Sequence, residues 1–183
     1  MNSSTLCSSL LVTLCMILIF QSPLPTKAGR SHVGPDLIDR VCNETKEDYA
    51  LCQDVLRRDH EVVKAKNFTE LAAAILKLGV KNAVEGQKFL KRLAKEKHVP
   101  EIEECATDDY DGVIRELRNS LGEMKDDLDA ANYEARIAGD GADYCSKALV
   151  DAKIDNPKIF ALNREISMIG FMAFNAMEKI GHE

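Results

Sequence analysis

Four cysteines are the residues of this sequence with the most chemistry to offer. Two further cysteines, Cys7 and Cys15, lie in an apolar N-terminal segment, and the four that follow it are Cys42, Cys52, Cys105 and Cys145. A thiol can act as a nucleophile, bind zinc or form a disulfide, and its compartment and spacing decide among these roles. The N-terminal segment therefore has to be interpreted first.

The first 28 residues are typical of a signal peptide. Residues 10–20 (LLVTLCMILIF) form an apolar run that is short for a membrane span but has the length of a signal-peptide core. Pro23 and Pro25 follow it, and Thr26-Lys27-Ala28 is a small-x-small site for signal peptidase. We expect cleavage near Ala28 and secretion, with an uncleaved anchor or a buried core helix as the alternatives.

In a secreted chain the four remaining cysteines are expected to form two disulfides. Sequence alone allows three pairings, of which the simplest is sequential, Cys42 with Cys52 and Cys105 with Cys145. On the loop-entropy model these bonds contribute about 2.8 and about 3.9 kcal/mol. Zinc is not expected, because there is no Cys-x-x-Cys pair and no histidine at ligand spacing from a cysteine pair.

Composition and missing motifs exclude several classes of protein. The 183 residues include 24 lysines and arginines against 30 aspartates and glutamates. The basic residues are distributed along the chain rather than in a stripe that neutralises phosphates, so nucleic acid is not an expected partner. The sequence has no Gly-x-Ser-x-Gly turn, His-Glu-x-x-His motif or phosphate-binding glycine loop. We expect one domain, residues 35–181, with no catalytic activity and no cofactor.

Two short helices are predicted first, around residues 38–42 and 49–56, and each carries a cysteine. Joined by Cys42 and Cys52, they form a hairpin that is too small to bury its own apolar face.

Four longer helices follow. The first runs from Asn67, a predicted cap, to about residue 97, and Gly79 and Gly86 within it each cost about 1 kcal/mol of helix propensity. The second begins at Pro100 and carries an apolar seam that continues to Leu128. The third, about 130–153, is rich in alanine and has a weak point at residues 139–141, and the last begins at Asn156-Pro157.

The fold class that these elements predict is all-α. No stretch alternates with period two, and the short connections force neighbouring helices to run antiparallel, as in an up-down four-helix bundle with an N-terminal helical hairpin. Cys105 lies near the start of the second long helix and Cys145 in the second half of the third, so an antiparallel pair brings them level. That geometry supports the sequential disulfides.

These features resemble the plant invertase and pectin methylesterase inhibitors over the whole chain after the signal peptide. The likeness rests on Ile38-x-x-Val41-Cys42, Thr45, Tyr49, Cys52-x-x-Val55-Leu56, Cys105 with Tyr110, Cys145 on an alanine-rich helix, and an apolar last helix. The resemblance implies a secreted protein that inhibits a plant cell-wall enzyme. The enzyme is either pectin methylesterase, whose pectin groove is covered, or acid invertase, whose sucrose pocket is blocked.

The sequence leaves both targets open. Invertase inhibitors carry Pro-Lys-Phe between the third and fourth cysteines, whereas residues 121–144 here have Met124-Lys125-Asp126 and no proline. A similar Pro157-Lys158-Ile159-Phe160 follows Cys145 and is interpreted as a helix start with two core residues. Ala161-Leu162-Asn163 resembles invertase inhibitors, and Tyr144 replaces a threonine that is common in pectin methylesterase inhibitors.

Three further expectations concern the surface. Asn43-Glu44-Thr45 and Asn67-Phe68-Thr69 are acceptor sites for N-glycans. The alanine-rich helix and the acidic turn at residues 125–129 are candidates for an enzyme contact, with a solvated loop as the alternative for the turn. The apoplast or cell wall is the expected location, or else the vacuole, with no membrane contact in the mature form. The alternative function is a carrier of lipid or another small ligand, which needs an apolar pocket left open by the alanine-rich helix.

Overall fold

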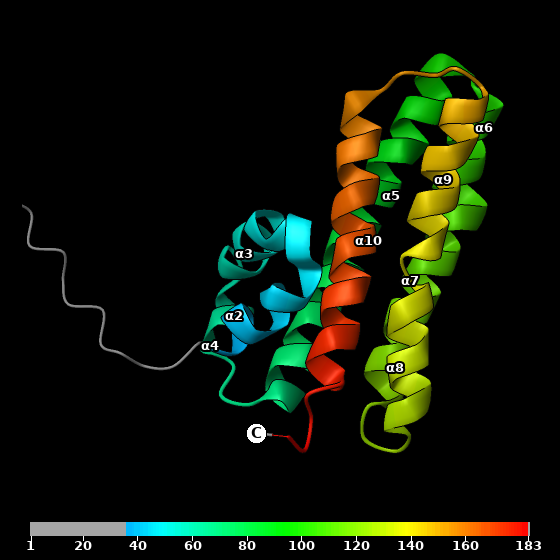
Figure 1. Ribbon diagram of the computed structural model, residues 1–183. Coiled ribbons are helices and arrows are strands. Elements are labelled where there is room, and N and C mark those ends of the chain that lie inside the picture. Colours follow the sequence, from blue (N-terminus) through cyan, green and yellow to red (C-terminus); the bar gives the residue numbers. More distant parts are fainter. Residues whose placement is uncertain (1–35, 183) are drawn as a thin grey trace, which may run out of the picture. The chain divides into compact units, whose positions relative to one another are not determined.

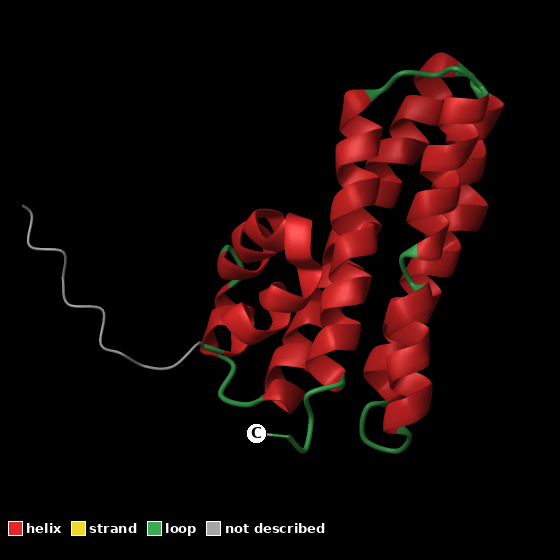
Figure 2. Cartoon of the chain, in the orientation of Figure 1, coloured by secondary structure: helices red, strands yellow, loops and turns green. Residues whose placement is uncertain are grey.

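The computed structural model describes residues 36–182, and these fold into one helical unit without strands (Figures 1 and 2). Its body is an antiparallel bundle of four rods, which confirms the predicted class and architecture. The rods are α5 (Phe68–Lys97), then α6 (Pro100–Glu104) with the π-helix η2 (Cys105–Asp109) and α7 (Tyr110–Glu123), then α8 (Leu128–Ile137) with α9 (Asp140–Asp151), and finally α10 (Pro157–Met177). The predicted signal peptide, residues 1–28, lies outside the described residues.

The order of the rods around the bundle decides which surfaces are free. α5 packs against α7 and α10, while α8 packs against the same two helices from the other side. α9 continues the rod of α8 and contacts α10, α7 and η2 (Figure 1). The rod formed by α8 and α9 therefore lies diagonally across the bundle from α5.

The N-terminal segment forms the predicted hairpin. α2 (Leu37–Cys42), η1 (Asn43–Asp48) and α3 (Tyr49–Arg57) are joined by the Cys42–Cys52 disulfide. A further helix, α4 (His60–Lys64), was not predicted, because five residues are too few to show a helical period. Its start is marked by Asp59, whose carboxylate accepts hydrogen bonds from the backbone N–H groups of Glu61 and Val62.

Polar contacts hold the hairpin against the bundle. Arg40 places its guanidinium 4.4 Å from the centre of the Phe68 ring on α5. Glu44 accepts a hydrogen bond from the Lys179 ammonium at 3.0 Å, and Asp48 forms an ion pair with Arg164 of α10. These contacts join the hairpin to α5, to α10 and to the residues after α10, and they supplement the burial of its apolar side chains, such as Val41 and Leu56, in the core.

Side-chain caps set the ends of the bundle helices. The Asn67 side chain accepts a hydrogen bond from the Glu70 backbone N–H at 2.8 Å, as predicted for the start of α5. The prediction that Leu128 continues the second rod is wrong. That rod's last helix ends at Glu123, and Leu128 begins α8 because Asp127 accepts a hydrogen bond from the Ala130 N–H at 3.0 Å and so caps a new helix.

The two glycines inside α5 permit close packing and do not interrupt the helix. A Cβ at Gly79 would lie 2.9 Å from Cγ2 of Ile169, and one at Gly86 would lie 2.9 Å from Cδ1 of Leu162. A larger residue at either position would force the Ile169 or Leu162 side chain, or the helix that carries it, to shift. The loss of helix propensity is therefore offset by helix–helix contact.

A buried chain of hydrogen bonds crosses the bundle. The Tyr110 hydroxyl of α7 donates to Oδ1 of Asn163 on α10 at 2.7 Å, and Nδ2 of Asn163 donates to Oγ of Ser146 on α9 at 2.9 Å. Both Tyr110 and Asn163 are fully buried. Because burial raises the pKa of Tyr110, its hydroxyl group stays protonated and can donate this hydrogen bond. These hydrogen bonds join three rods.

None of the described helices combines the length and the apolar character that crossing a membrane requires.

Tyr110→Phe is expected to lower the free energy of unfolding by about 1–3 kcal/mol, because it leaves Oδ1 of Asn163 buried without a donor. Urea unfolding followed by circular dichroism measures the change. Tyr133→Phe removes the same hydroxyl from an exposed side chain and serves as the control. Equal stability of the two variants would mean that the buried chain of hydrogen bonds contributes nothing to the free energy of unfolding.

Candidate functional site

Two large exposed side chains lie on the outward face of α9, and a third, Tyr133, is exposed on the preceding helix α8. Tyr144 is 63% exposed and Val150 is 61% exposed, although both belong to a helix whose inner face is fully buried. They share the outward face with four charged residues, and we define this group as the α9 surface: Asp140, Asp143, Tyr144, Lys147, Val150 and Asp151. Large exposed side chains on a rigid helix are typical anchors of a protein interface.

Three glycines let α9 and the end of α8 lie close to their neighbours. A Cβ at Gly141 would lie 2.5 Å from the Asp109 carbonyl oxygen, and one at Gly139 would lie 3.0 Å from Cα of Ser167. A Cβ at Gly170 of α10 would lie 2.9 Å from the carbonyl oxygen of Ala135 in α8. The rod bends at Ala138 and Gly139, where the sequence predicted a weak point. The glycines therefore allow this rod to approach both neighbouring rods closely.

A disulfide fixes the same helix from the inside. Cys105 in η2 is bonded to Cys145, with their Cα atoms 5.0 Å apart, which is the sequential pairing. Cys145 directly follows Tyr144, so the bond that holds the buried residue also sets the direction of the exposed ring. Asp109 lies near both sulfur atoms, but sulfurs joined in a disulfide offer no thiolate to a metal ion.

A groove of about 260 Å³ runs between α9 and the rod that contains η2 and α7. Tyr144 and Ile137 contribute apolar area, while Arg115 forms an ion pair with Glu116 at 2.7 Å. The remaining side-chain charges are all negative, and they come from Asp108, Asp109 and Asp140. The groove is thus acidic with an aromatic rim.

One carboxyl group of the acidic groove, that of Asp109, has a raised pKa. Partial burial, together with the charges of Glu104 and Asp108, raises the pKa of Asp109 to about 6. Further along α7 and α8, a hydrogen bond between the carboxyl groups of Glu116 and Glu134 raises the pKa of Glu134 above its usual range. This side of the bundle therefore takes up protons at mildly acidic pH.

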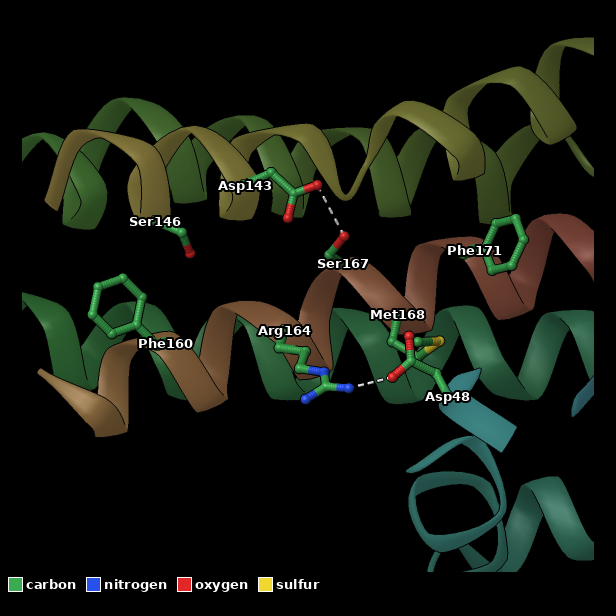
Figure 3. A pocket seen from close by; sticks show the side chains of 8 residues that line it. All are labelled: Asp48, Asp143, Ser146, Phe160, Arg164, Ser167, Met168 and Phe171. Carbon is green, nitrogen blue, oxygen red and sulfur yellow. Dashed lines mark hydrogen bonds and ion pairs between the residues drawn. The ribbon is translucent and has the colours of Figure 1, made fainter. Parts of the chain in front are cut away.

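A second groove, of about 300 Å³, lies on the other side of α9, between α9, α10 and η1 (Figure 3). Asp143 of the α9 surface accepts a hydrogen bond from the Ser167 hydroxyl at 3.1 Å, and Arg164 is paired with Asp48. Phe160 and Phe171 lie at opposite ends of the groove (Figure 3). α9 is therefore a ridge with an acidic groove on one side and a mixed polar and aromatic groove on the other.

Only some of the motifs singled out in the sequence lie at the α9 surface or its grooves. Phe160 of the Pro157–Phe160 motif lines the second groove, whereas Ile159 is fully buried. The acidic turn at residues 125–129 lies at the connection between α7 and α8, where Asp127 acts as a cap. Sequence reasoning missed Phe171 and Arg164, since their distance from Cys145 along the chain hides their proximity to α9.

The two glycan sites lie away from α9. Asn43 is exposed at the start of η1, and Asn67 is half-buried, with its side chain capping α5.

Comparison with known proteins gives this arrangement a context. The family model for plant invertase/pectin methylesterase inhibitors matches residues 36–175. The chain belongs to this family. No curated protein sequence matches the chain. Among solved structures, the crystal structure of mutant form A of a pectin methylesterase inhibitor from Arabidopsis is similar, with a TM-score of 0.67 at 18% identity over 77% of this chain and 95% of that one. At that identity the likeness shows the shared inhibitor fold.

Gly141→Ala is expected to destabilise the protein by about 1–3 kcal/mol, because the new methyl group meets the Asp109 backbone oxygen and α9 must shift. Gly122→Ala is the matched control, since nothing lies within 4 Å of its Cβ position, and there the gain in helix propensity is expected to stabilise. Thermal unfolding of both variants measures the difference. A Gly141→Ala variant as stable as wild type would show that α9 has room to move.

Asp109→Asn is expected to raise stability at pH 7 by about 1 kcal/mol, allowing for solvent screening at a half-buried site. The native carboxyl group has a pKa of about 6, above its unfolded value, so ionisation at neutral pH opposes folding and that opposition is lost as the pH falls from about 7 to about 4. The advantage of the variant should therefore shrink to zero by about pH 4. A constant advantage from pH 7 to pH 4, measured by urea unfolding, would contradict the assignment.

Proposed function

We propose that this protein inhibits a plant cell-wall carbohydrate enzyme, either pectin methylesterase or acid invertase, by binding it through the α9 surface. Family membership supports the inhibitory role, and the solved neighbour is itself described as a pectin methylesterase inhibitor. The observation that carries the placement is the exposed Tyr144 ring on a helix held by the Cys105–Cys145 disulfide and close glycine contacts.

Rigidity of the α9 surface favours tight binding. A partner that covers Tyr144 and Val150 buries apolar area without first having to order a loop, so little conformational entropy is lost on association. The acidic groove beside Tyr144 adds charge that favours a basic partner and speeds encounter with it. Residues 101–155, which include the α9 surface, hold sixteen carboxylates and six lysines or arginines.

The structure argues against the alternative role of carrier. That role needs space along the alanine-rich rod, but Ala131, Ala135, Ala138 and Ala142 are at most 1% exposed and pack directly on their neighbours. Gly141 has no room even for a methyl group. The grooves beside α9 face outward and suit a surface contact better than an enclosed ligand.

The remaining assignments belong to the same proposal. We propose that residues 1–28 are removed on secretion to the apoplast or cell wall, that residues 35–181 form the inhibitor domain, and that the domain has no catalytic activity. N-glycans are proposed at Asn43 and Asn67. Both have solvent access, and a glycan on Nδ2 of Asn67 leaves Oδ1 free for its bond to Glu70. Mass spectrometry of the protein from plant culture, compared with Asn43→Gln and Asn67→Gln variants, measures occupancy.

Titration of the oxidised protein against several pectin methylesterases and acid invertases at about pH 5 tests the inhibitory role directly. Dose-dependent loss of one activity, together with a complex on gel filtration, is the expected result. A protein that is folded and disulfide-bonded but neither inhibits nor binds any enzyme of either class would refute the proposal.

Tyr144→Ala is expected to raise the inhibition constant about tenfold or more, because the variant removes the largest exposed side chain of the α9 surface. Val63→Ala, which truncates an exposed apolar residue on α4, is the control and should leave inhibition unchanged. Circular dichroism establishes that both variants are folded. If the Val63 variant loses inhibition and the Tyr144 variant keeps it, the interface lies on the hairpin side.

A further inference from the structure

A stripe of positive charge runs along the outer face of α5. Six exposed cations fall within an arc of about 100° when projected down the helix axis and extend over about 27 Å. We define this basic stripe as Lys77, Lys81, Lys88, Lys91, Arg92 and Lys95. The prediction that no such stripe forms is wrong for α5, because a helix brings residues three, four and seven positions apart onto one face.

The basic stripe carries a net positive charge, although carboxylates lie near it: Glu85 is one turn beyond Lys81, and Glu61 and Glu70 line a groove together with Lys77. No ion pair joins any of the six cations to a carboxylate within residues 36–182, and the same is true of exposed Lys125 and Lys158, whereas Arg57, Arg115 and Lys147 are paired. Lys77 with Lys81, Lys88 with Arg92 and Lys91 with Lys95 are like charges one turn apart, and such pairs weaken a helix. The helix dipole favours cations only in the last turn, which accounts for Lys95 but for none of the first three.

A groove of about 440 Å³ lies at the C-terminal end of the stripe, between α5 and the start of the next rod. Ala94 and Ala106 provide an apolar wall, and Lys91 and Lys95 of the stripe stand at its edge. Glu103, His98 and Thr107 complete the lining with groups that can bind hydroxyls, although the Glu103 charge opposes an anion next to it. An apolar wall with neighbouring cations and hydroxyl partners suits a sugar ring that carries a carboxylate.

We propose that the basic stripe binds a linear polysaccharide of uronic acids. Five of its six cations are lysines, and the stripe carries no exposed aromatic side chain on which nucleic-acid bases could stack. The stripe has the length to contact several carboxylates in a row, and the groove at its end accommodates one residue of the chain.

The position of the basic stripe would allow the protein to bind a polysaccharide and an enzyme at the same time. α5 lies diagonally across the bundle from the α9 surface, so an enzyme bound at α9 leaves the stripe exposed. Hydrolysis of the methyl esters of pectin produces free carboxylates, so the product of a pectin methylesterase is a ligand of the class proposed here. This use rests on the proposed function, whereas the binding itself does not. An inhibitor held on de-esterified polymer would be concentrated where the enzyme has acted.

Binding of the oxidised protein to polygalacturonate at about 20 mM salt, measured by calorimetry, tests the proposal. The triple variant Lys88→Gln/Lys91→Gln/Lys95→Gln should bind at least about tenfold more weakly, and wild-type binding should weaken steeply as salt rises to about 200 mM. Lys125→Gln/Lys153→Gln/Lys158→Gln makes the same change in net charge at exposed positions outside the stripe and should bind as wild type does. Circular dichroism checks the fold of both.

Three results would overturn the proposal: no binding to polygalacturonate, equal weakening in both triple variants, or equally tight binding to DNA of the same charge concentration. Highly methyl-esterified pectin should not bind, because it lacks the carboxylates. Inhibition assays keep the two proposals separate. Inhibition without polygalacturonate binding refutes only the stripe, and polygalacturonate binding without inhibition refutes only the enzyme-binding role.

Discussion

The close approach of α9 to the π-helix η2 is the constraint on which the rest of the structure depends. A Cβ at position 141 would lie 2.5 Å from the Asp109 carbonyl oxygen, and one turn further on Cys145 is covalently joined to Cys105. The helix cannot rotate without breaking both contacts. Because Tyr144 precedes Cys145, the inward direction of the sulfur atom determines the outward direction of the ring. A rigid exposed aromatic group is thus a consequence of how the core closes.

The same approach has an electrostatic cost. Bringing α9 against η2 and α7 gathers carboxyl groups from three elements, and the pKa of Asp109 rises to about 6 because the carboxylate loses water and faces Glu104 and Asp108. Further along the same two rods, a hydrogen bond from the Glu134 carboxyl group to Glu116 raises the pKa of Glu134. The crowding costs less in an acidic compartment, which agrees with the cell-wall location proposed for this protein.

Sequence reasoning predicted the elements of the fold well, because caps and apolar periods are local. Asn67 and Asn156 cap α5 and α10 as expected, and the bend at residues 138–139 coincides with the predicted weak point. Sequence reasoning was wrong where an element is too short to show a period or where its role depends on contacts with distant residues. α4 has only five residues, and Leu128 fits the apolar period of the rod before it, so the Asp127 cap was overlooked. From the sequence, Gly79 and Gly86 only lower helix propensity, and their role in close packing becomes clear from their contacts with α10.

The candidate site was harder to predict, since a surface is made by elements that are distant in sequence. Tyr144 was noticed as an unusual neighbour of Cys145, but nothing in the sequence places Arg164 and Phe171 beside α9 or pairs Arg164 with Asp48. The basic stripe on α5 was likewise not predicted from the sequence. Along the chain the basic residues look evenly distributed, and only the geometry of a 30-residue helix collects six of them on one face. The order of the rods then separates that face from the acidic one. If both proposals hold, one side of the bundle contacts the enzyme and the other a uronic-acid polymer, and neither contact requires the bundle to change shape.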